Sequence, residues 1–255
     1  MSKDTLKLND REVLAYARET LEPHLALEAD GYRNLRVVAR GVDTQLFCPS
    51  RRSQELRQSW GAKPDDLVAL YVGRLAPEKN LPLALRAFSM LRKRHPGARL
   101  VLVGDGPLRN ELQREAPGAI FAGMRTGTDL AAHYASADLF LFPSMTETYG
   151  NVTLEAMASG LAVLAYDYAA AQELIRHGDN GWLVPFGDAE DFVSASADIG
   201  GPEHIRRLGQ QAFLSACRQD WEAIHDEFES ALAHIVLAHE RNRHVDGIQL
   251  GPRAA

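Results

Sequence analysis

The feature that most constrains the fold is a regular alternation of short apolar runs with amphipathic segments from residue 67 onward. Leu67–Val72, Leu100–Val103 and Leu139–Phe142 are continuous apolar runs, the pattern of strands buried on both faces. Between the first two runs, apolar residues recur at helical spacing from Leu81 to Leu91. The alternation predicts an α/β fold with a doubly wound, mostly parallel, Rossmann-like sheet covered by helices on both faces.

The remaining elements follow from the same periodicities. We expect further strands at 35–39, 119–122 and 162–165, and helices at 8–29, 129–135, 152–158, 188–198, 202–218 and 221–239. One more helix starts at Pro107, and another contains Glu173 after the strand at 162–165. We therefore expect three parts of the chain. The first, at 1–40, is an N-terminal helix and strand that form a remnant or a connector. A main α/β domain follows at 41–220, and a C-terminal helix with a polar, fraying tail at 221–255.

Composition excludes several classes of function. The chain has 255 residues, 45% of them hydrophobic and 24% charged, with a net charge of −6. A negative chain is a poor partner for nucleic acid or an anionic membrane surface. The sequence contains no run long enough for a transmembrane segment and no signal-peptide hydrophobic region. We therefore expect a cytoplasmic protein, in which Cys48 and Cys217 are reduced, buried thiols.

The loop after the first strand of the main domain carries one candidate site. Gly73 allows the backbone to approach a ligand closely, and Arg74 and Lys79 follow at the carboxyl end of the strand. Two cations there can neutralise a diphosphate, and the guanidinium can bind it through two hydrogen bonds. The alternative is a solvated loop in which Glu78 pairs with Arg74 or Lys79.

A second candidate site follows the strand at 139–142. Gly150 permits a tight turn, and the backbone N–H groups of Asn151, Val152 and Thr153 then open a helix, where an oxyanion is favoured. Glu147 lies before the turn and can accept hydrogen bonds from sugar hydroxyls. Glu155, one turn into the helix, can accept them from a vicinal diol such as a ribose. The alternative is that Glu147 is a solvated loop residue and that Glu155 only interacts favourably with the dipole of its helix.

Several motifs together resemble one protein family. They are Val72–Asn80 (VGRLAPEKN), Leu102–Pro107 (LVGDGP), Glu147–Glu155 (ETYGNVTLE), Gly178–Pro185 (GDNGWLVP) and the connection-like Arg40–Pro49 (RGVDTQLFCP). This set resembles the C-terminal, donor-binding domain of retaining glycosyltransferases with the GT-B fold, of the group 1 or family 4 type. The resemblance covers roughly residues 30 to 240.

The resemblance implies a role for each matching residue. Arg74 and Lys79 would hold the diphosphate of a nucleotide-sugar donor and offset the charge of the leaving group, and Glu147 would contact the donor sugar. Gly73, Gly150, Asn151, Val152 and Thr153 would line the donor, Glu155 would bind the ribose, and the segment with Met124 would lie beside the base. The implied reaction transfers a hexosyl group, with retention, from GDP-mannose or a UDP-sugar to an acceptor hydroxyl.

We predict that no cofactor or metal is required. No Asp-x-Asp pair stands in a suitable loop, which agrees with metal-independent members of the resembled family, where cations and a helix dipole replace Mg²⁺. Gly104-Asp-Gly106 lacks the third glycine of a dinucleotide fingerprint and does not follow the first strand, so a dehydrogenase is disfavoured. Asp105 is expected to cap the helix that follows.

Only one half of such an enzyme is matched by this sequence. Upstream of Arg40 stand 39 residues, too few for a second domain of about 100–200 residues. We therefore expect an N-terminal acceptor domain to be supplied by another chain, with the nucleotide-sugar as the small-molecule partner. The main alternative is a non-catalytic nucleotide-sugar-binding module. The second alternative is a sugar-nucleotide epimerase of the same architecture, which would also need the N-terminal domain.

Overall fold

The computed structural model describes residues 12–16, 29–31, 33–38, 40–146 and 151–248. The chain divides into two compact units. One consists of Val42–Asp220, and the other combines Met1–Gly41 with Trp221–Ala255.

The larger unit is built on a parallel sheet. Among the described residues, six strands pair in the order β5-β4-β3-β6-β7-β8, and every neighbouring pair is parallel. The strands are β3 (Val68–Val72), β4 (Arg99–Val103), β5 (Ile120–Gly123), β6 (Leu139–Phe142), β7 (Ala162–Tyr166) and β8 (Trp182–Val184). The doubly wound α/β architecture predicted from the sequence is confirmed.

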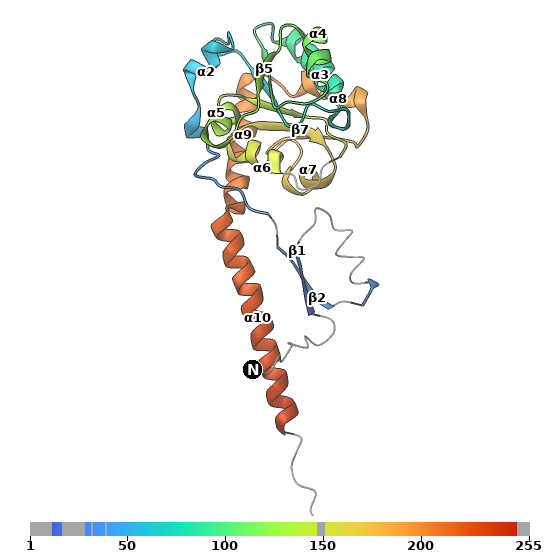
Figure 1. The fold of residues 1–255 in the computed structure, drawn as a ribbon, viewed down its shortest axis with the longest axis vertical. Helices are drawn as coiled ribbons and strands as arrows, with labels where there is room; N and C mark the ends of the chain where they lie inside the picture. Colours follow the sequence, from blue (N-terminus) through green and yellow to red (C-terminus); the bar gives the residue numbers. More distant parts are fainter. Residues whose placement is uncertain (1–11, 17–28, 32, 39, 147–150, 249–255) are drawn as a thin grey trace, which may run out of the picture. The chain divides into compact units, whose positions relative to one another are not determined.

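Helices cover both faces of this sheet (Figure 1). They are α2 (Gln54–Ser59), α3 (Leu81–Arg94), α4 (Arg109–Glu115), α5 (Gly127–Ala135), α6 (Asn151–Ala158), α7 (Ala169–Leu174), α8 (Ala189–Asp198) and α9 (Pro202–Ala216). Short 3₁₀ turns lie at Pro49–Arg51, Pro77–Lys79 and Cys217–Gln219. Helix α3 packs against α8, and α6 packs against α9. The Ser196 hydroxyl of α8 donates to the Ala87 carbonyl of α3 at 2.7 Å, which fixes the first pair.

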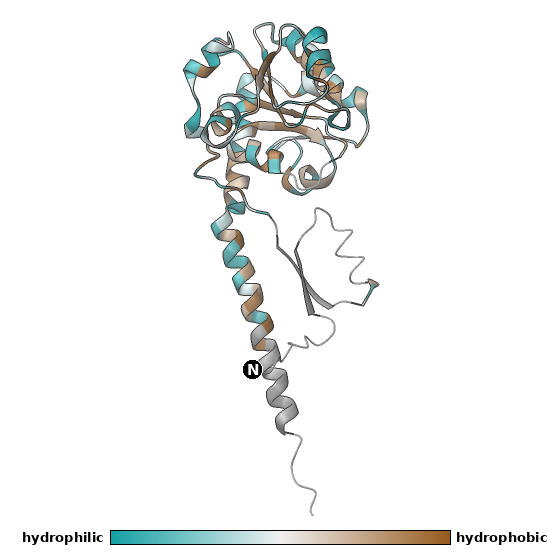
Figure 2. Cartoon of the chain, viewed as in Figure 1, coloured by the Kyte–Doolittle hydropathy of each residue, from teal (hydrophilic) through white to brown (hydrophobic). Residues whose placement is uncertain are grey.

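The core lies between the helices and the sheet. All residues of β3, β6 and β7 are buried, and Figure 2 shows these strands in the hydrophobic colour. Leu70, Phe140 and Leu164 have no exposed surface. Strands buried on both faces need apolar side chains at every position, which is why their sequences read as continuous apolar runs.

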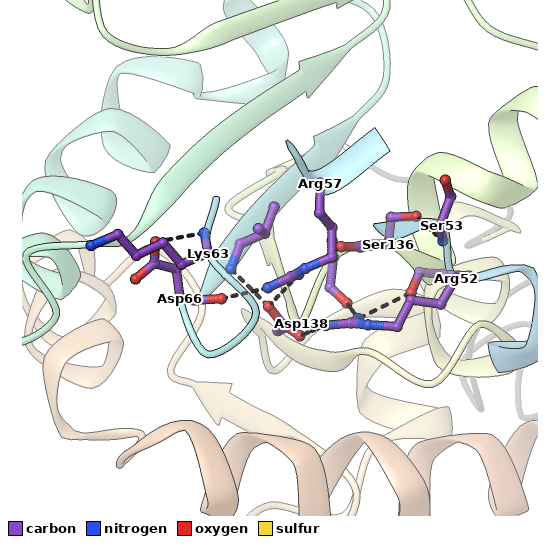
Figure 3. A network of polar contacts seen from close by, with 10 residues as sticks. Arg52, Ser53, Arg57, Lys63, Asp66, Ser136 and Asp138 are labelled. Atoms are coloured by element: carbon purple, nitrogen blue, oxygen red, sulfur yellow. Dashed lines mark hydrogen bonds and ion pairs between the residues drawn. The ribbon is translucent and has the colours of Figure 1, made fainter. Parts of the chain in front are cut away.

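A buried polar network lies at the amino-terminal edge of the sheet, where the strands begin (Figure 3). Asp138, directly before β6, binds the guanidinium groups of Arg57 at 3.0 Å and Arg52 at 2.7 Å. It also accepts a 2.8 Å hydrogen bond from the Val68 backbone N–H at the start of β3. Arg57 further donates to the Asp66 carbonyl at 2.6 Å. One carboxylate therefore joins the segment around α2 to the two central strands.

Four features of the larger unit differ from the sequence prediction. Helix α2 and strand β8 are additional elements. Helix α2 begins where the Ser53 hydroxyl accepts from the Leu56 N–H at 3.1 Å, an N-cap. The helix predicted from Pro107 begins at Arg109 instead, because Leu108 N–H donates to the Leu75 carbonyl at 3.0 Å and holds the turn against the neighbouring loop. Asp105 does not cap it. Its carboxylate accepts from the Gly106 N–H and pairs with Arg109.

The predicted burial of the two cysteines is also wrong. Cys48 is half-buried and Cys217 is exposed. Cys217 opens the 3₁₀ turn that follows α9, and no residue of that turn is buried.

The smaller unit corrects two expectations. Within the helix predicted at 8–29, residues Glu12–Tyr16 form a strand, β1, parallel to β2 (Arg33–Val38), while residues 8–11 and 17–28 lie outside the described residues. The stretch EVLAY has Val and Tyr, which favour strands, and pairing with β2 satisfies its backbone groups. Helix α10 runs from Trp221 to Ile248, past the predicted end at His239, since nothing before Gly247 breaks a helix. None of the described helices is long and apolar enough to cross a membrane.

Candidate functional site

The carboxyl edge of the sheet has one topological switch point, between β3 and β6. From β3 the chain proceeds outward to β4 and β5, and from β6 it proceeds the other way to β7 and β8. Ligands of open α/β sheets bind in the crevice outside the carboxyl ends of the strands at such a point. Both segments singled out from the sequence follow these two strands.

Two glycines bring the loops after β3 and β4 into backbone contact. Gly73 (φ 152°) donates to the Val103 carbonyl at 3.0 Å, and Gly104 (φ 131°) donates to the Gly123 carbonyl at 2.8 Å. A Cβ atom on Gly104 would fall onto the Gly73 carbonyl oxygen, well inside van der Waals contact. These glycines therefore shape the loop that carries Arg74 and Lys79.

Gly104→Ala is expected to lower the free energy of unfolding by about 1–3 kcal/mol, since overpacking against a backbone atom forces a main-chain shift. Gly127→Ala is the matched control. Gly127 also has a positive φ, of 54°, but a Cβ atom added there would meet no neighbouring atom within 4 Å. Chemical denaturation of both variants measures the difference, and equal losses would show that the contact with Gly73 is unimportant.

The Lys79 side chain connects the loop after β3 with the loop after β6. It ends the 3₁₀ turn after β3, and its Nζ donates to the Thr146 carbonyl at 2.9 Å and to the Ser144 hydroxyl at 3.3 Å, beyond β6. The same Nζ lies 6.0 Å from the ring centre of Phe142, the last residue of β6. Lys79 is half-buried, so its charge is less screened than that of a surface lysine. A cation is thus fixed in the crevice where open α/β sheets bind ligands.

Arg74 lies in the same loop but is exposed. Its guanidinium forms an ion pair with Glu78, and the Tyr71 hydroxyl donates to its carbonyl at 3.1 Å. The pairing with Glu78 is the alternative raised from the sequence. An exposed ion pair contributes little free energy, so a phosphate can replace Glu78 as the partner of Arg74.

Helix α6 follows β6 and so begins at the same carboxyl edge of the sheet. Asn151, Val152 and Thr153 are its first three residues, and the first N–H groups of any helix have no acceptor within the helix. The Thr153 side chain is buried, and its hydroxyl has no hydrogen-bond partner among the described residues. Glu147 and Gly150, the other two residues predicted here, lie outside the described residues.

Glu155 occupies a partly buried position in α6. Its carboxylate accepts a 3.0 Å hydrogen bond from the hydroxyl of Tyr134, a fully buried residue of α5. Burial raises the pKa of Glu155 to about 7, and the Tyr134 hydrogen bond offsets part of that rise. A partly desolvated carboxyl group whose hydrogen-bond donor is a neutral phenol is costly for folding, which favours a role in binding.

The raised pKa predicts how stability depends on pH. Because the folded-state pKa lies above the unfolded one, ionisation of Glu155 opposes folding, so its penalty is absent at pH 4 and complete above pH 7. Glu155→Gln should therefore raise the free energy of unfolding at pH 8 by about 2 kcal/mol and leave it nearly unchanged at pH 4. Urea denaturation at the two pH values tests this, and a parallel shift at both would refute it.

Met124 lies at the same edge of the sheet, two strands from β3. It follows β5 directly and its side chain is 71% exposed. The structure thus brings Lys79 against the β6 loop and places Arg74, Asn151, Val152 and Met124 along the same edge. Within the described residues, no group of three or more His, Cys, Asp or Glu side chains could hold a metal ion.

Sequence reasoning missed two residues of this site. Ser144 is buried and contacts Lys79, and its position after Pro143 at the end of a strand could have indicated it. Tyr134 orients Glu155 from 21 positions away, and no local pattern could have shown that contact.

Comparison with known proteins identifies the family. The sequence signature of the family Glycosyl transferases group 1 matches residues 66–201, which include β3 to β8 and both loops of the switch point. The chain belongs to this family. A GDP-mannose-dependent alpha-mannosyltransferase of Mycobacterium tuberculosis is 41% identical over 227 residues, covering 87% of this chain and 56% of that protein.

Solved structures of glycosyl transferases share the fold. HepE from Anabaena, solved with UDP and glucose, superposes with a TM-score of 0.66 at 25% identity, covering 82% of this chain and 60% of that one. The C-terminal domain of LpcC, a group 1 glycosyl transferase from Francisella tularensis, superposes with a TM-score of 0.62 at 23% identity. That match covers 70% of this chain and 98% of the domain. The chain spans about half the length of the curated relatives it matches.

Proposed function

We propose that this chain is the donor-binding part of a retaining hexosyltransferase, which takes a hexosyl group from a nucleotide-sugar and delivers it to an acceptor hydroxyl. The observation that carries the proposal is the ammonium group of half-buried Lys79 at the switch point, on the sheet edge where α6 follows β6. A cation and a helix N-terminus at one place suit a diphosphate.

The proposed chemistry follows from those charges. As the bond between the sugar C1 and the diphosphate loosens, negative charge grows on the departing diphosphate. Lys79, Arg74 and the first N–H groups of α6 stabilise that charge, so they act more strongly in the transition state than in the ground state. The acceptor hydroxyl attacks from the face that the diphosphate leaves, which gives retention. Glu147 contacts the donor sugar, and no carboxylate is assigned as a covalent nucleophile.

GDP-mannose is the first candidate donor and a UDP-sugar the second. The first is supported by the M. tuberculosis relative, which is named as GDP-mannose-dependent. The second is supported by HepE, whose structure was solved with UDP and glucose. Glu155 would accept from the ribose hydroxyls of either donor, and Met124 would lie beside the base. We propose that metal is not needed, that the reaction is cytoplasmic, and that an N-terminal acceptor domain completes the site.

Incubating the purified chain with GDP-mannose or UDP-glucose in EDTA, and following the nucleotide and the anomeric proton by NMR, tests the proposal. The expected result is slow release of the nucleoside diphosphate with an α-configured sugar as the first product. A β-configured first product would contradict retention. Donor binding without any release, both by the chain alone and after an N-terminal acceptor domain is supplied, would favour the alternative of a non-catalytic binding module.

A further inference from the structure

A cavity of about 570 Å³ lies at the amino-terminal edge of the sheet, away from the donor site. Its walls come from the 3₁₀ turn at Pro49–Arg51, from the turns that lead into β6 and β7, and from α9. The volume falls within the range of about 300–1,000 Å³ that small-molecule pockets occupy. All of its lining residues belong to the larger unit.

The lining of this cavity carries a net positive charge. Asp138 is its one acidic lining residue among those described, and its carboxylate binds the guanidinium groups of Arg52, which also lines the cavity, and of Arg57 (Figure 3). Arg206 of α9 is the second lining arginine, so two cations stand against one anion. No hydrogen bond or ion pair within the described residues engages the Arg206 side chain. The cavity is therefore suited to an anion.

The rest of the lining combines apolar surface with polar side chains of α9. Phe213 and Leu214 supply apolar surface from α9, and Leu214 is 52% exposed. Gln210 and Gln211 add exposed polar side chains to the same wall of the cavity. An apolar surface with polar groups beside it suits a small organic molecule.

We propose that this cavity is a second ligand site, separate from the donor site, for a small organic anion with an apolar body. The anionic group pairs with Arg206 and Arg52, and the apolar body covers Phe213 and Leu214.

The test uses 1-anilinonaphthalene-8-sulfonate, an aromatic anion whose fluorescence rises on binding, with the full chain. We expect one saturable site whose affinity falls as NaCl is raised, because screening weakens the attraction between charges. The neutral analogue N-phenyl-1-naphthylamine should bind more weakly. Saturating GDP and UDP should leave the fluorescence unchanged, which separates this site from the donor site. Displacement by either nucleotide would overturn the proposal.

Two substitutions locate the probe. Arg206→Gln should weaken binding about fivefold, as expected for an exposed charge-assisted contact. Gln210→Glu, which adds a negative charge to the lining with little change of shape, should weaken it similarly. Arg207→Gln is the control, because Arg207 is the neighbouring arginine, does not line this cavity, and donates to His204. Circular dichroism checks that each variant is folded. Unchanged affinity in both Arg206→Gln and Gln210→Glu, or an equal loss in Arg207→Gln, would refute the site.

Discussion

Replacing Lys79 by alanine is expected to weaken the binding of a nucleoside diphosphate by at least about tenfold. A hydrogen bond to a charged group contributes about 1.5–3 kcal/mol, and each 1.4 kcal/mol corresponds to a factor of ten. Lys79 should reach this range rather than the lower value of surface charges, because it is half-buried and its ammonium group is held by Thr146 and Ser144. Calorimetric titration of the variant measures the loss.

Two further variants separate charge from a general effect of mutation. Lys79→Arg keeps the positive charge and should recover part of the affinity, although the guanidinium cannot reproduce the point-like contact of an ammonium group. Lys93→Ala removes an equally charged side chain from the exposed side of α3 and should leave affinity unchanged. If Lys79→Ala binds as tightly as the parent chain, the cationic loop does not hold the diphosphate.

Replacing Asp138 by alanine is expected to have the largest effect on stability, lowering the free energy of unfolding by about 3–5 kcal/mol. The substitution leaves the guanidinium of Arg57, which is 1% exposed, without its anionic partner (Figure 3). It also removes the acceptor of the Val68 N–H at the start of β3. A buried charge without a partner is far more costly than the ion pair was favourable.

An exposed ion pair serves as the control for Asp138. Arg86 of α3 and Glu190 of α8 form a pair at 2.6 Å, with side chains 52% and 81% exposed. Glu190→Ala should change stability by no more than about 1 kcal/mol, because solvent screens such pairs. Guanidinium chloride denaturation of both variants gives the comparison. Equal losses in the free energy of unfolding would mean that burial does not make the Asp138 network more important for stability than an exposed ion pair.

The sequence is most informative where one physical requirement dominates. The strands β3, β6 and β7 are buried on both faces, so each of their positions must be apolar, and the apolar runs predict their bounds to within one residue at each end. The loop at 73–79 and the start of α6 can likewise be assigned to one sheet edge, because parallel strands all present their carboxyl ends there.

Other features depend on contacts that no local pattern encodes. Strand β8 has three residues between glycine- and proline-containing loops, too short a run to show a period. An aspartate before a strand suggests a turn, and only the fold reveals that Asp138 receives two arginines. The helix predicted over Glu12–Tyr16 is wrong because the periodicity there is weak and the pairing with β2 is not local. Tertiary context overrides propensity in such segments.

The Glu155 environment shows the same limit within the site. The sequence predicts the position of this acid near the start of a helix, but not its contact with Tyr134 or its raised pKa. Both arise because α5 and α6 pack side by side and withdraw the carboxyl group from water.

Calorimetric titration of the purified chain with GDP and with UDP, in the presence of EDTA, tests the central claim most directly. We predict saturable binding of one nucleoside diphosphate per chain without metal, and the nucleotide that binds more tightly identifies the base of the donor. Failure of a folded chain to bind either nucleotide would contradict a donor site at the crevice between β3 and β6. Binding that required a divalent metal would contradict the proposal that Lys79, Arg74 and the start of α6 replace it.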